Sequence, residues 1–154
     1  MADKAVKLIS QNRKAFHDYH IEKTIEAGLV LKGSEVKSCR EGKVQLVDSF
    51  ASFSKGELFL HKANISEFKQ GGPFYNHPPV RTRKLLLKKK ELQQLLTAID
   101  KDGYTLIPIK IYFKNGYAKI ELGLAKGKTR GDKRDTLKKK EVQRSMDQAK
   151  RRDR

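Results

Sequence analysis

The chain has 154 residues and a formal net charge of +17, from 35 Lys and Arg against 18 Asp and Glu. This length suffices for one domain with a real hydrophobic core and a short appendage. Such an excess of positive charge predicts a polyanionic partner, either nucleic acid or an anionic membrane surface. No run of about 18 apolar residues exists, and the first residues lack the apolar core of a signal peptide, so we expect no membrane partner.

The single cysteine, Cys39, excludes an intramolecular disulfide and cysteine-based zinc modules. It is expected to be a small core residue of a protein in the reducing cytoplasm.

The chain is expected to begin with a loosely ordered stretch, followed by a segment whose composition suits RNA binding. Residues 1–11 are short and mixed in character. Residues 12–19, NRKAFHDY, interleave aromatic side chains with cations and hydrogen-bonding groups, a mixture that suits RNA. An equally good interpretation is that Phe16 and Tyr19 anchor the N-terminal segment on the core.

A strand and a short helix follow. Apolar residues recur through 19–31, which predicts a strand, and Gly33-Ser34 interrupts it. Ser34 is expected to cap a helix that ends near Arg40, because serine accepts the free N–H groups of a first turn. Val36 and Cys39 would share the buried face of this helix.

The middle of the chain predicts two strands and a loop. Residues 44–53 and 57–64 read as strands joined by a hairpin turn at 54–56 that contains Gly56. The glycines and prolines of 70–79 indicate a loop, in which Phe74, Tyr75 and His77 are expected to be exposed. Residues 81–84, RTRK, form a second basic cluster.

The last third contains the clearest patterns. Leucines and Ile99 at helical spacing predict an amphipathic helix that ends near Asp100. Alternating apolar residues around Asn115-Gly116 predict a two-stranded hairpin over 104–125 with a type I′ turn. Pro108 should lie at an edge or a bulge, because proline cannot donate to the ladder.

These elements predict a mainly β fold with short helices, a small antiparallel barrel of the oligonucleotide-binding type. The predicted domain spans 1–125 and carries a net charge of +9, and a basic tail spans 126–154 with +8. The tail has too few apolar residues to pack on the barrel, so it should be disordered alone and become ordered on a polyanion.

Nothing in the sequence favours an enzyme. No P-loop, dinucleotide glycine pattern or nucleophile elbow is present, and the histidines lack partners at metal-ligand spacing. We therefore expect no catalytic residue, no metal and no cofactor. A nuclease that uses His17 and a carboxylate is the weakest alternative, and it predicts cleavage that is lost in His17→Ala.

Several long segments, in order, closely resemble the SmpB family of SsrA-binding proteins, the bacterial partners of transfer-messenger RNA. These segments are NRKAFHDY (12–19), EAGLVLKGSEVKSCREGK (26–43), VDSF (47–50), RTRKLLL (81–87), GYTLIPIKIYFKNGYAKIELGLAKGK (103–128) and DKR (132–134). The resemblance implies a barrel that binds the tRNA-like domain of transfer-messenger RNA and brings it to stalled ribosomes. There, translation switches to the RNA's own reading frame, which tags the incomplete peptide and frees the ribosome.

The resemblance also implies two sets of site residues. The RNA face would comprise Asn12, Arg13, Lys14, His17, Glu26, Arg40, Leu86 and Lys119. The tail would contact the decoding region of the small subunit through Asp132, Lys133, Arg134, Lys138, Lys139 and Lys140. The family often has a bulky side chain just before the DKR triplet, but Gly131 stands here, so we assign it no stacking role.

Two functional hypotheses remain. The first is a non-enzymatic adaptor for ribosome rescue, with transfer-messenger RNA and the stalled ribosome as partners, and nothing demands more than a monomer. The alternative is a structural protein of the ribosome or nucleoid that binds nucleic acid in general. An adaptor should prefer one folded RNA at salt that removes nonspecific binding, whereas a general binder should show one steep salt dependence with every RNA.

Overall fold

The structure is a computed structural model that describes residues 6–127. Its elements in chain order are β1 (Val6–Gln11), α1 (Lys14–Asp18), β2 (Tyr19–Leu29), α2 (Gly33–Arg40), β3 (Val44–Gln45), β4 (Phe50–Ser54), β5 (Glu57–His61), β6 (Asn64–Ile65), the 3-10 helix η1 (Lys69–Gly71), β7 (Arg83–Leu86), α3 (Lys89–Asp102), β8 (Thr105–Lys114) and β9 (Tyr117–Gly127). The expected disorder of the tail, and its six expected ribosome contacts, lie outside the described residues. β9 continues two residues beyond the expected domain boundary at 125.

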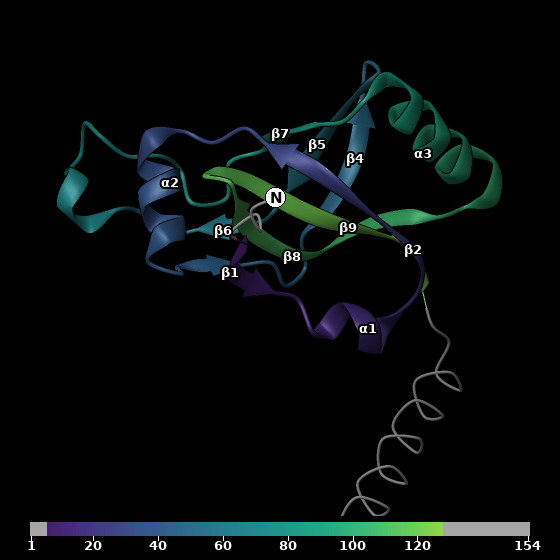
Figure 1. Cartoon of the computed structure of the whole chain (residues 1–154), viewed down its shortest axis with the longest axis horizontal. Helices are drawn as coiled ribbons and strands as arrows, with labels where there is room; N and C mark the ends of the chain where they lie inside the picture. The colour runs from purple at the N-terminus through teal and green to yellow at the C-terminus, as the bar shows by residue number, and fades with distance from the viewer. Residues whose placement is uncertain (1–5, 128–154) are drawn as a thin grey trace, which may run out of the picture.

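Six antiparallel strands close into a ring of paired neighbours, in the order β8-β4-β5-β7-β2-β9 and back to β8. β1 pairs with the second half of β8, whose first residues pair with β4, and β3 and β6 form a separate short pair. Helix α2 lies at one end of the molecule and α3 at the other (Figure 1). The prediction of a mainly β, antiparallel fold with short helices is confirmed.

The core fills the inside of this ring. Leu58 of β5, Leu106 of β8, and Ile120 and Leu122 of β9 are completely buried. Alternate residues of β5 are buried, but in β8 and β9 consecutive residues are buried, and Ile107 and Ala125 of these strands pack with Ala15 of α1 in a second, smaller cluster.

Both predicted hairpin turns are present. Lys55-Gly56 joins β4 to β5 and Asn115-Gly116 joins β8 to β9, and all four residues have positive φ, as a type I′ turn requires. The register of β8 against β9 shifts just after Pro108, so the proline lies at a bulge as predicted.

Helix α3 begins where a carboxylate offsets its cationic first turn. The N–H of Lys88 donates to Glu91 Oε1 at 3.2 Å, and this negative charge near the helix start favours the dipole that the lysines oppose. Leu95 is the buried residue of the apolar face, and Gly103 ends the helix with a φ of 70°. The predicted helix is confirmed.

Three local predictions are wrong. Residues 6–11 are strand β1 rather than loosely ordered, because β8 offers them a free edge. The predicted strands over 44–53 and 57–64 are each two strands, β3 and β4 in the first and β5 and β6 in the second, because β3 pairs with β6 while β4 pairs with β5. Ser34 lies inside α2 rather than before it, because Glu35 accepts the Lys32 N–H at 2.7 Å and so starts the helix earlier.

Candidate nucleic-acid interface

An open groove crosses the outer face of β7, β2 and β9. Gly28 of β2 pairs with Leu86 of β7 on one side and with Lys119 of β9 on the other. A Cβ on Gly28 would lie 3.2 Å from the Cβ of Leu86, so only glycine lets β7 approach this closely without displacement. Three of the predicted site residues thus come together in a groove lined by Glu26, Gly28, Leu86, Leu87, Lys88, Glu91 and Lys119.

Glu26 forms one wall of this groove and is held there by β8. Its Oε2 accepts hydrogen bonds from Tyr112 Oη at 2.5 Å and from Lys114 Nζ at 3.3 Å. The Tyr112 hydrogen bond, with the nearby lysines, lowers the pKa of Glu26 although partial burial opposes this. Burial, reinforced by Glu26, raises the pKa of Tyr112. Glu26 is therefore an oriented, charged acceptor suited to the N–H groups of a base edge.

Leu86 and Lys119 supply the other two kinds of contact. The Leu86 side chain is 52% exposed on the strand surface, where an unstacked base could pack on it. Lys119 is half-buried in the same groove, and its positive charge contributes to the lowered pKa of Glu26. The groove thus combines an apolar surface, a cation and an acceptor within three adjacent strands.

The residues from 12 to 17 lie on a different part of the surface and differ in exposure. Asn12 is only 4% exposed, and its Nδ2 donates to the carbonyl oxygens of Pro108 at 3.1 Å and Leu46 at 3.4 Å. Arg13 and Lys14 are exposed and His17 is half-buried. Asn12 therefore anchors this segment on β8, while the two cations project from it.

Arg40 is the last residue of α2 and is exposed, as predicted. On the same helix, Cys39 is buried but Val36 is only half-buried, so the expected pairing of these two on the core face is wrong. The buried face instead consists of Ser34, Glu35, Ser38 and Cys39. Burial raises the pKa of the Cys39 thiol to about 12, so this cysteine stays protonated.

The residues of the basic cluster expected at 81–84 do not lie together on the surface. Arg83 is completely buried, and Arg81 is partly covered, because both pair with the buried carboxylate of Glu35. Arg83 Nε donates to Glu35 Oε2 at 2.6 Å and Arg81 Nη2 to Oε1 at 2.5 Å. Burial alone would raise the pKa of Glu35, but these arginines and the Lys32 N–H outweigh it and lower the pKa. Arg81 and Arg83 thus hold α2 on the ring, whereas Thr82 and Lys84 of the same segment are exposed.

The proline- and glycine-rich loop has one exposed end and one buried end. Phe74 is fully exposed and Tyr75 is 43% exposed, as expected. His77 is only 3% exposed, so its predicted exposure is wrong. Its ring nitrogens are 2.8 Å from Ser34 Oγ and 2.8 Å from the Ile65 carbonyl oxygen, and these contacts fasten the loop to α2 and β6.

Sequence reasoning missed Tyr112 and Lys114 as partners of Glu26. The alternation of side chains along β8 does predict that Lys110, Tyr112 and Lys114 lie on one face of the strand. The sequence does not indicate that this face lies over β2, because the contact joins residues 86 and 88 positions apart.

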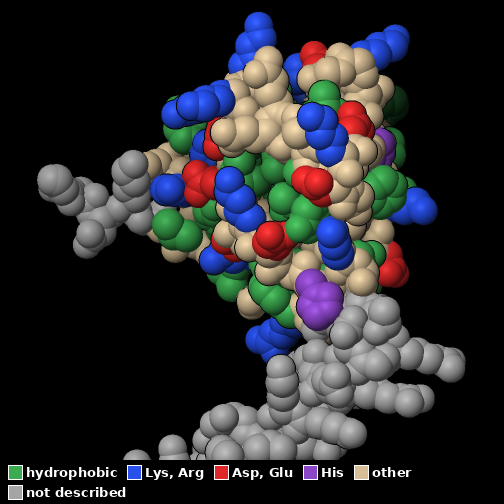
Figure 2. Space-filling view, turned by 90° about the vertical axis from the view of Figure 1, so that its right-hand side faces the viewer, with side chains coloured by type: hydrophobic (Ala, Val, Ile, Leu, Met, Phe, Trp, Pro, Cys, Tyr) green, Lys and Arg blue, Asp and Glu red, His purple; other side chains and the backbone are tan. Residues whose placement is uncertain are grey.

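The remaining surface charge is dispersed. Figure 2 shows one face of the molecule, on which Lys and Arg side chains project at many places with Asp and Glu between them. Within residues 6–127, no three His, Cys, Asp or Glu side chains are grouped so that they could hold a metal ion. In the same part of the chain, no helix is long and apolar enough to cross a membrane.

Comparisons with known proteins agree with one another. The model of the SmpB protein family matches residues 9–152. The SsrA-binding protein of Geobacillus thermodenitrificans (strain NG80-2) is 57% identical over 143 residues, which cover 93% of this chain and 92% of that protein. The SsrA-binding protein of Bacillus cereus (strain ATCC 10987 / NRS 248) is also 57% identical with the same coverage.

One solved structure, "tmRNA-SmpB: a journey to the center of the bacterial ribosome", contains a chain of the same fold. The TM-score is 0.66 at 49% sequence identity, and the match covers 83% of this chain and 93% of that chain. A family model that spans almost the whole sequence, together with relatives at this identity, is decisive. The chain belongs to the SmpB protein family.

Proposed function

We propose that the protein is an RNA-binding adaptor of trans-translation. It binds the tRNA-like domain of transfer-messenger RNA and delivers it to stalled ribosomes, where incomplete peptides are tagged. Family membership supports this function, as do relatives named SsrA-binding proteins and a solved complex of transfer-messenger RNA with SmpB on the bacterial ribosome. Its role is recognition and delivery rather than catalysis, and it acts in the cytoplasm as a monomer.

The observation that carries the proposal is the groove formed by Glu26, Leu86 and Lys119. An unpaired base packs on the exposed leucine, its N–H edge donates to the oriented carboxylate, and the lysine neutralises a neighbouring phosphate. A single-stranded loop presents such bases, whereas a regular RNA helix hides them. The groove therefore suits a folded RNA with an exposed loop, as the tRNA-like domain has.

The other candidate residues extend this contact. Arg13 and Lys14 before and in α1, and Arg40 at the end of α2, are exposed cations that can meet phosphates. His17 would hydrogen-bond or stack. Asn12 supports the proposal by anchoring the segment that carries the two cations. We assign the ribosome contacts to the tail residues named above.

The first test compares the full chain with residues 1–127, which end where β9 ends. Each binds the tRNA-like domain at moderate salt, with unrelated RNA as competitor. Equal and selective binding by both proteins is expected, because every strand of the ring lies within residues 6–127. If selectivity disappears with competitor, a general polyanion binder is favoured and the adaptor function fails.

A second test is Lys119→Ala, which should weaken binding of the tRNA-like domain and reduce the salt slope by about one. Lys101→Ala is the matched control, because Lys101 is an exposed lysine in the last turn of α3 and does not line the groove. Equal loss in the two variants would remove Lys119 from the site.

A further inference from the structure

The loop that joins β6 to β7 forms one end of the molecule. This β6–β7 loop (residues 66–82) passes beyond α2 and contains the short helix η1 (Figure 1). The side chain of its Phe74 is fully exposed. A single exposed apolar side chain is common on protein surfaces, so the significance of Phe74 depends on how firmly the loop holds it in place.

The β6–β7 loop is closed by its own side chains. The Phe68 N–H donates to Asn76 Oδ1 at 2.8 Å, and Asn76 Nδ2 donates to the carbonyl oxygens of Phe68 and Gly72, both at 2.9 Å. The next residue, His77, is buried in contact with α2 and β6. These contacts fix the backbone close to Phe74, so an ordered loop presents a ring that is not itself packed, and ordering the loop costs nothing when a partner binds.

Tyr75 anchors the tip of the loop on the outer face of α2. A Cβ on Gly33 of this helix would lie 2.5 Å from Tyr75 Oη, and a Cβ on Gly71 would lie 3.0 Å from Tyr75 Cδ1, so glycine at both positions leaves room for the ring. Lys37 Nζ lies 4.9 Å from the centroid of the Tyr75 ring and 5.3 Å from that of Phe68, distances at which a cation is attracted to a ring face. Tyr75 is thus held against the protein, whereas the residue before it faces water.

Cations lie beside this loop. Lys37 and Arg40 are three positions apart on α2, so Arg40 follows along the face on which Tyr75 lies. Lys69 in η1 is exposed, and Glu67 is the only acidic residue in the sequence of the loop. An exposed aromatic ring with flanking cations is a combination that binds single-stranded nucleic acid by base and phosphate together. Arg40 already belongs to the proposed RNA contact, and the loop continues that contact along α2.

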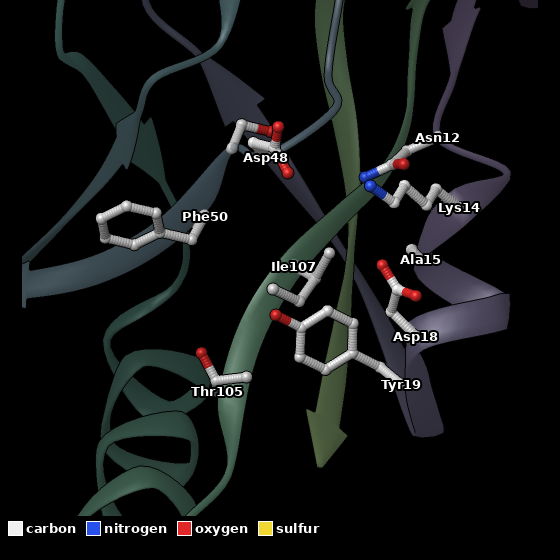
Figure 3. Close-up of a pocket in the computed structure, with 10 residues that line it drawn as sticks. Asn12, Lys14, Ala15, Asp18, Tyr19, Asp48, Phe50, Thr105 and Ile107 are labelled. Atoms are coloured by element: carbon white, nitrogen blue, oxygen red, sulfur yellow. The ribbon is translucent and has the colours of Figure 1, made fainter. Parts of the chain in front are cut away.

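The cavity beside α1 has a different character. It lies between α1, the start of β8 and the segment that leads into β4, and its volume is about 260 Å³ (Figure 3). The carboxylates of Asp18 and Asp48 both line it, together with one lysine, Lys14. Two carboxylates repel the phosphate that every nucleotide carries. The exposed ring of the β6–β7 loop is therefore better suited to a nucleotide than the interior of this cavity.

We propose that the β6–β7 loop is a second contact for the tRNA-like domain, in which an unstacked base packs on the ring of Phe74 and the neighbouring cations meet its phosphates. Stacking on an aromatic ring tolerates every base, so this contact adds affinity without selecting sequence. The inference rests on the proposed RNA-binding function and adds to it a surface that does not share a residue with the Glu26 groove.

Phe74→Ala in the full chain tests the contact by fluorescence anisotropy with the tRNA-like domain. We expect the affinity to fall about fivefold or more, which is the effect of removing one aromatic ring from a stacked base. The slope of the logarithm of the affinity against the logarithm of the salt concentration should stay unchanged, because no charge is removed. An unchanged affinity, or a loss that comes with a changed salt slope, would overturn the proposal.

Two variants of the same loop are the controls. Phe74→Tyr keeps an aromatic ring, and Val80→Ala removes an exposed apolar side chain that has no ring. Both should bind the tRNA-like domain within about twofold of wild type. All of these side chains are exposed, so the thermal midpoints of the variants should match that of wild type. A loss in either control as large as that in Phe74→Ala would show that the ring does not stack on a base.

Phe74→benzoylphenylalanine, a photoreactive substitution, identifies what touches this position. The variant is bound to transfer-messenger RNA and to a stalled ribosome and is then irradiated. Cross-links to nucleotides of the tRNA-like domain are expected. Cross-links confined to ribosomal RNA, or to a ribosomal protein, would overturn the proposal, because the loop would then serve another partner.

The wild-type chain separates this inference from the function on which it rests. If wild type does not prefer the tRNA-like domain over unrelated RNA, the proposed function fails. If it does prefer that domain but Phe74→Ala binds it equally well, only the contact of the β6–β7 loop is overturned.

Discussion

Loss of Glu35 is expected to destabilise this protein more than loss of a surface carboxylate. The Glu35 carboxylate is completely buried between Arg81 and Arg83, whereas the ion pair of Glu57 with Lys84 is about half exposed at both ends. Removing one partner of a buried pair leaves the other charge without compensation, while an exposed pair competes with water. Two ion pairs on the same ring should therefore differ greatly in their effect on folding.

We expect Glu35→Gln to lower the free energy of unfolding by about 3–5 kcal/mol, because Arg83 would remain buried without its counterion. Glu57→Gln is the matched control and should cost at most about 1 kcal/mol. Urea denaturation of both variants measures the difference. Similar losses in the two variants would show that the buried cluster does not stabilise α2 as described.

The lowered pKa of Glu35 gives this contribution a defined pH dependence. Because the folded-state pKa lies below the usual value of 4.5, the charged form stabilises the protein above that value. The contribution is lost as the pH falls through the folded pKa, where wild type becomes protonated and resembles Glu35→Gln. The stability difference between the two proteins should be largest at neutral pH and smaller at about pH 3. A difference that grows on acidification would contradict this assignment.

At the scale of elements, the β8–β9 hairpin organises the ring. β8 pairs with β9 along almost its whole length and also with β4 and β1, and β9 pairs in turn with β2. The turn at Asn115-Gly116 sets the register of this hairpin. Through β9, it also sets which residue lies beside Gly28 in the groove.

Gly116→Ala tests the importance of this turn. Gly116 has a φ of 81°, a conformation that alanine adopts only with strain, so we expect a loss of about 1 kcal/mol or more in unfolding free energy. Gly127 is the last residue of β9, the strand that follows this turn. Gly127→Ala has open space around the added methyl group and should leave the unfolding free energy nearly unchanged. Thermal unfolding followed by circular dichroism compares them, and equal midpoints would argue against a strained turn.

At the scale of the whole molecule, the positive charge is divided almost equally between two parts of the chain. Residues 126–154 carry a net +8 of the total +17. Deleting residues 128–154 should leave the thermal midpoint nearly unchanged, because the ring of strands is complete within 6–127. It should also reduce the salt dependence of binding to unrelated RNA, since fewer cations displace counterions. A large fall in the midpoint would mean that the tail is part of the folded unit.

Local patterns predicted the parts of the fold in which neighbours in sequence are neighbours in space. Helix α3 follows from leucine spacing, and the β8–β9 hairpin follows from Asn115-Gly116 between two alternating runs. β1 was missed because its short sequence carries little pattern of its own, and it is a strand only where β8 provides an edge. His77 and Arg83 looked exposed because histidine and arginine usually are, and their partners lie 43 and 48 positions away.

The candidate site, too, was predicted in part from the sequence and in part is visible only in the tertiary structure. The basic composition predicted a nucleic-acid partner, and the long matching segments identified the family and pointed to Glu26, Leu86 and Lys119. The sequence by itself thus determined the charge, the local elements and the family, because each depends on the chain alone. Only the tertiary structure decided that Arg83 is structural, that Tyr112 orients Glu26, and that Asn12 and Asp48 share a cavity. These facts depend on closing the ring, which brings together residues far apart in the sequence and decides which polar groups water can still reach.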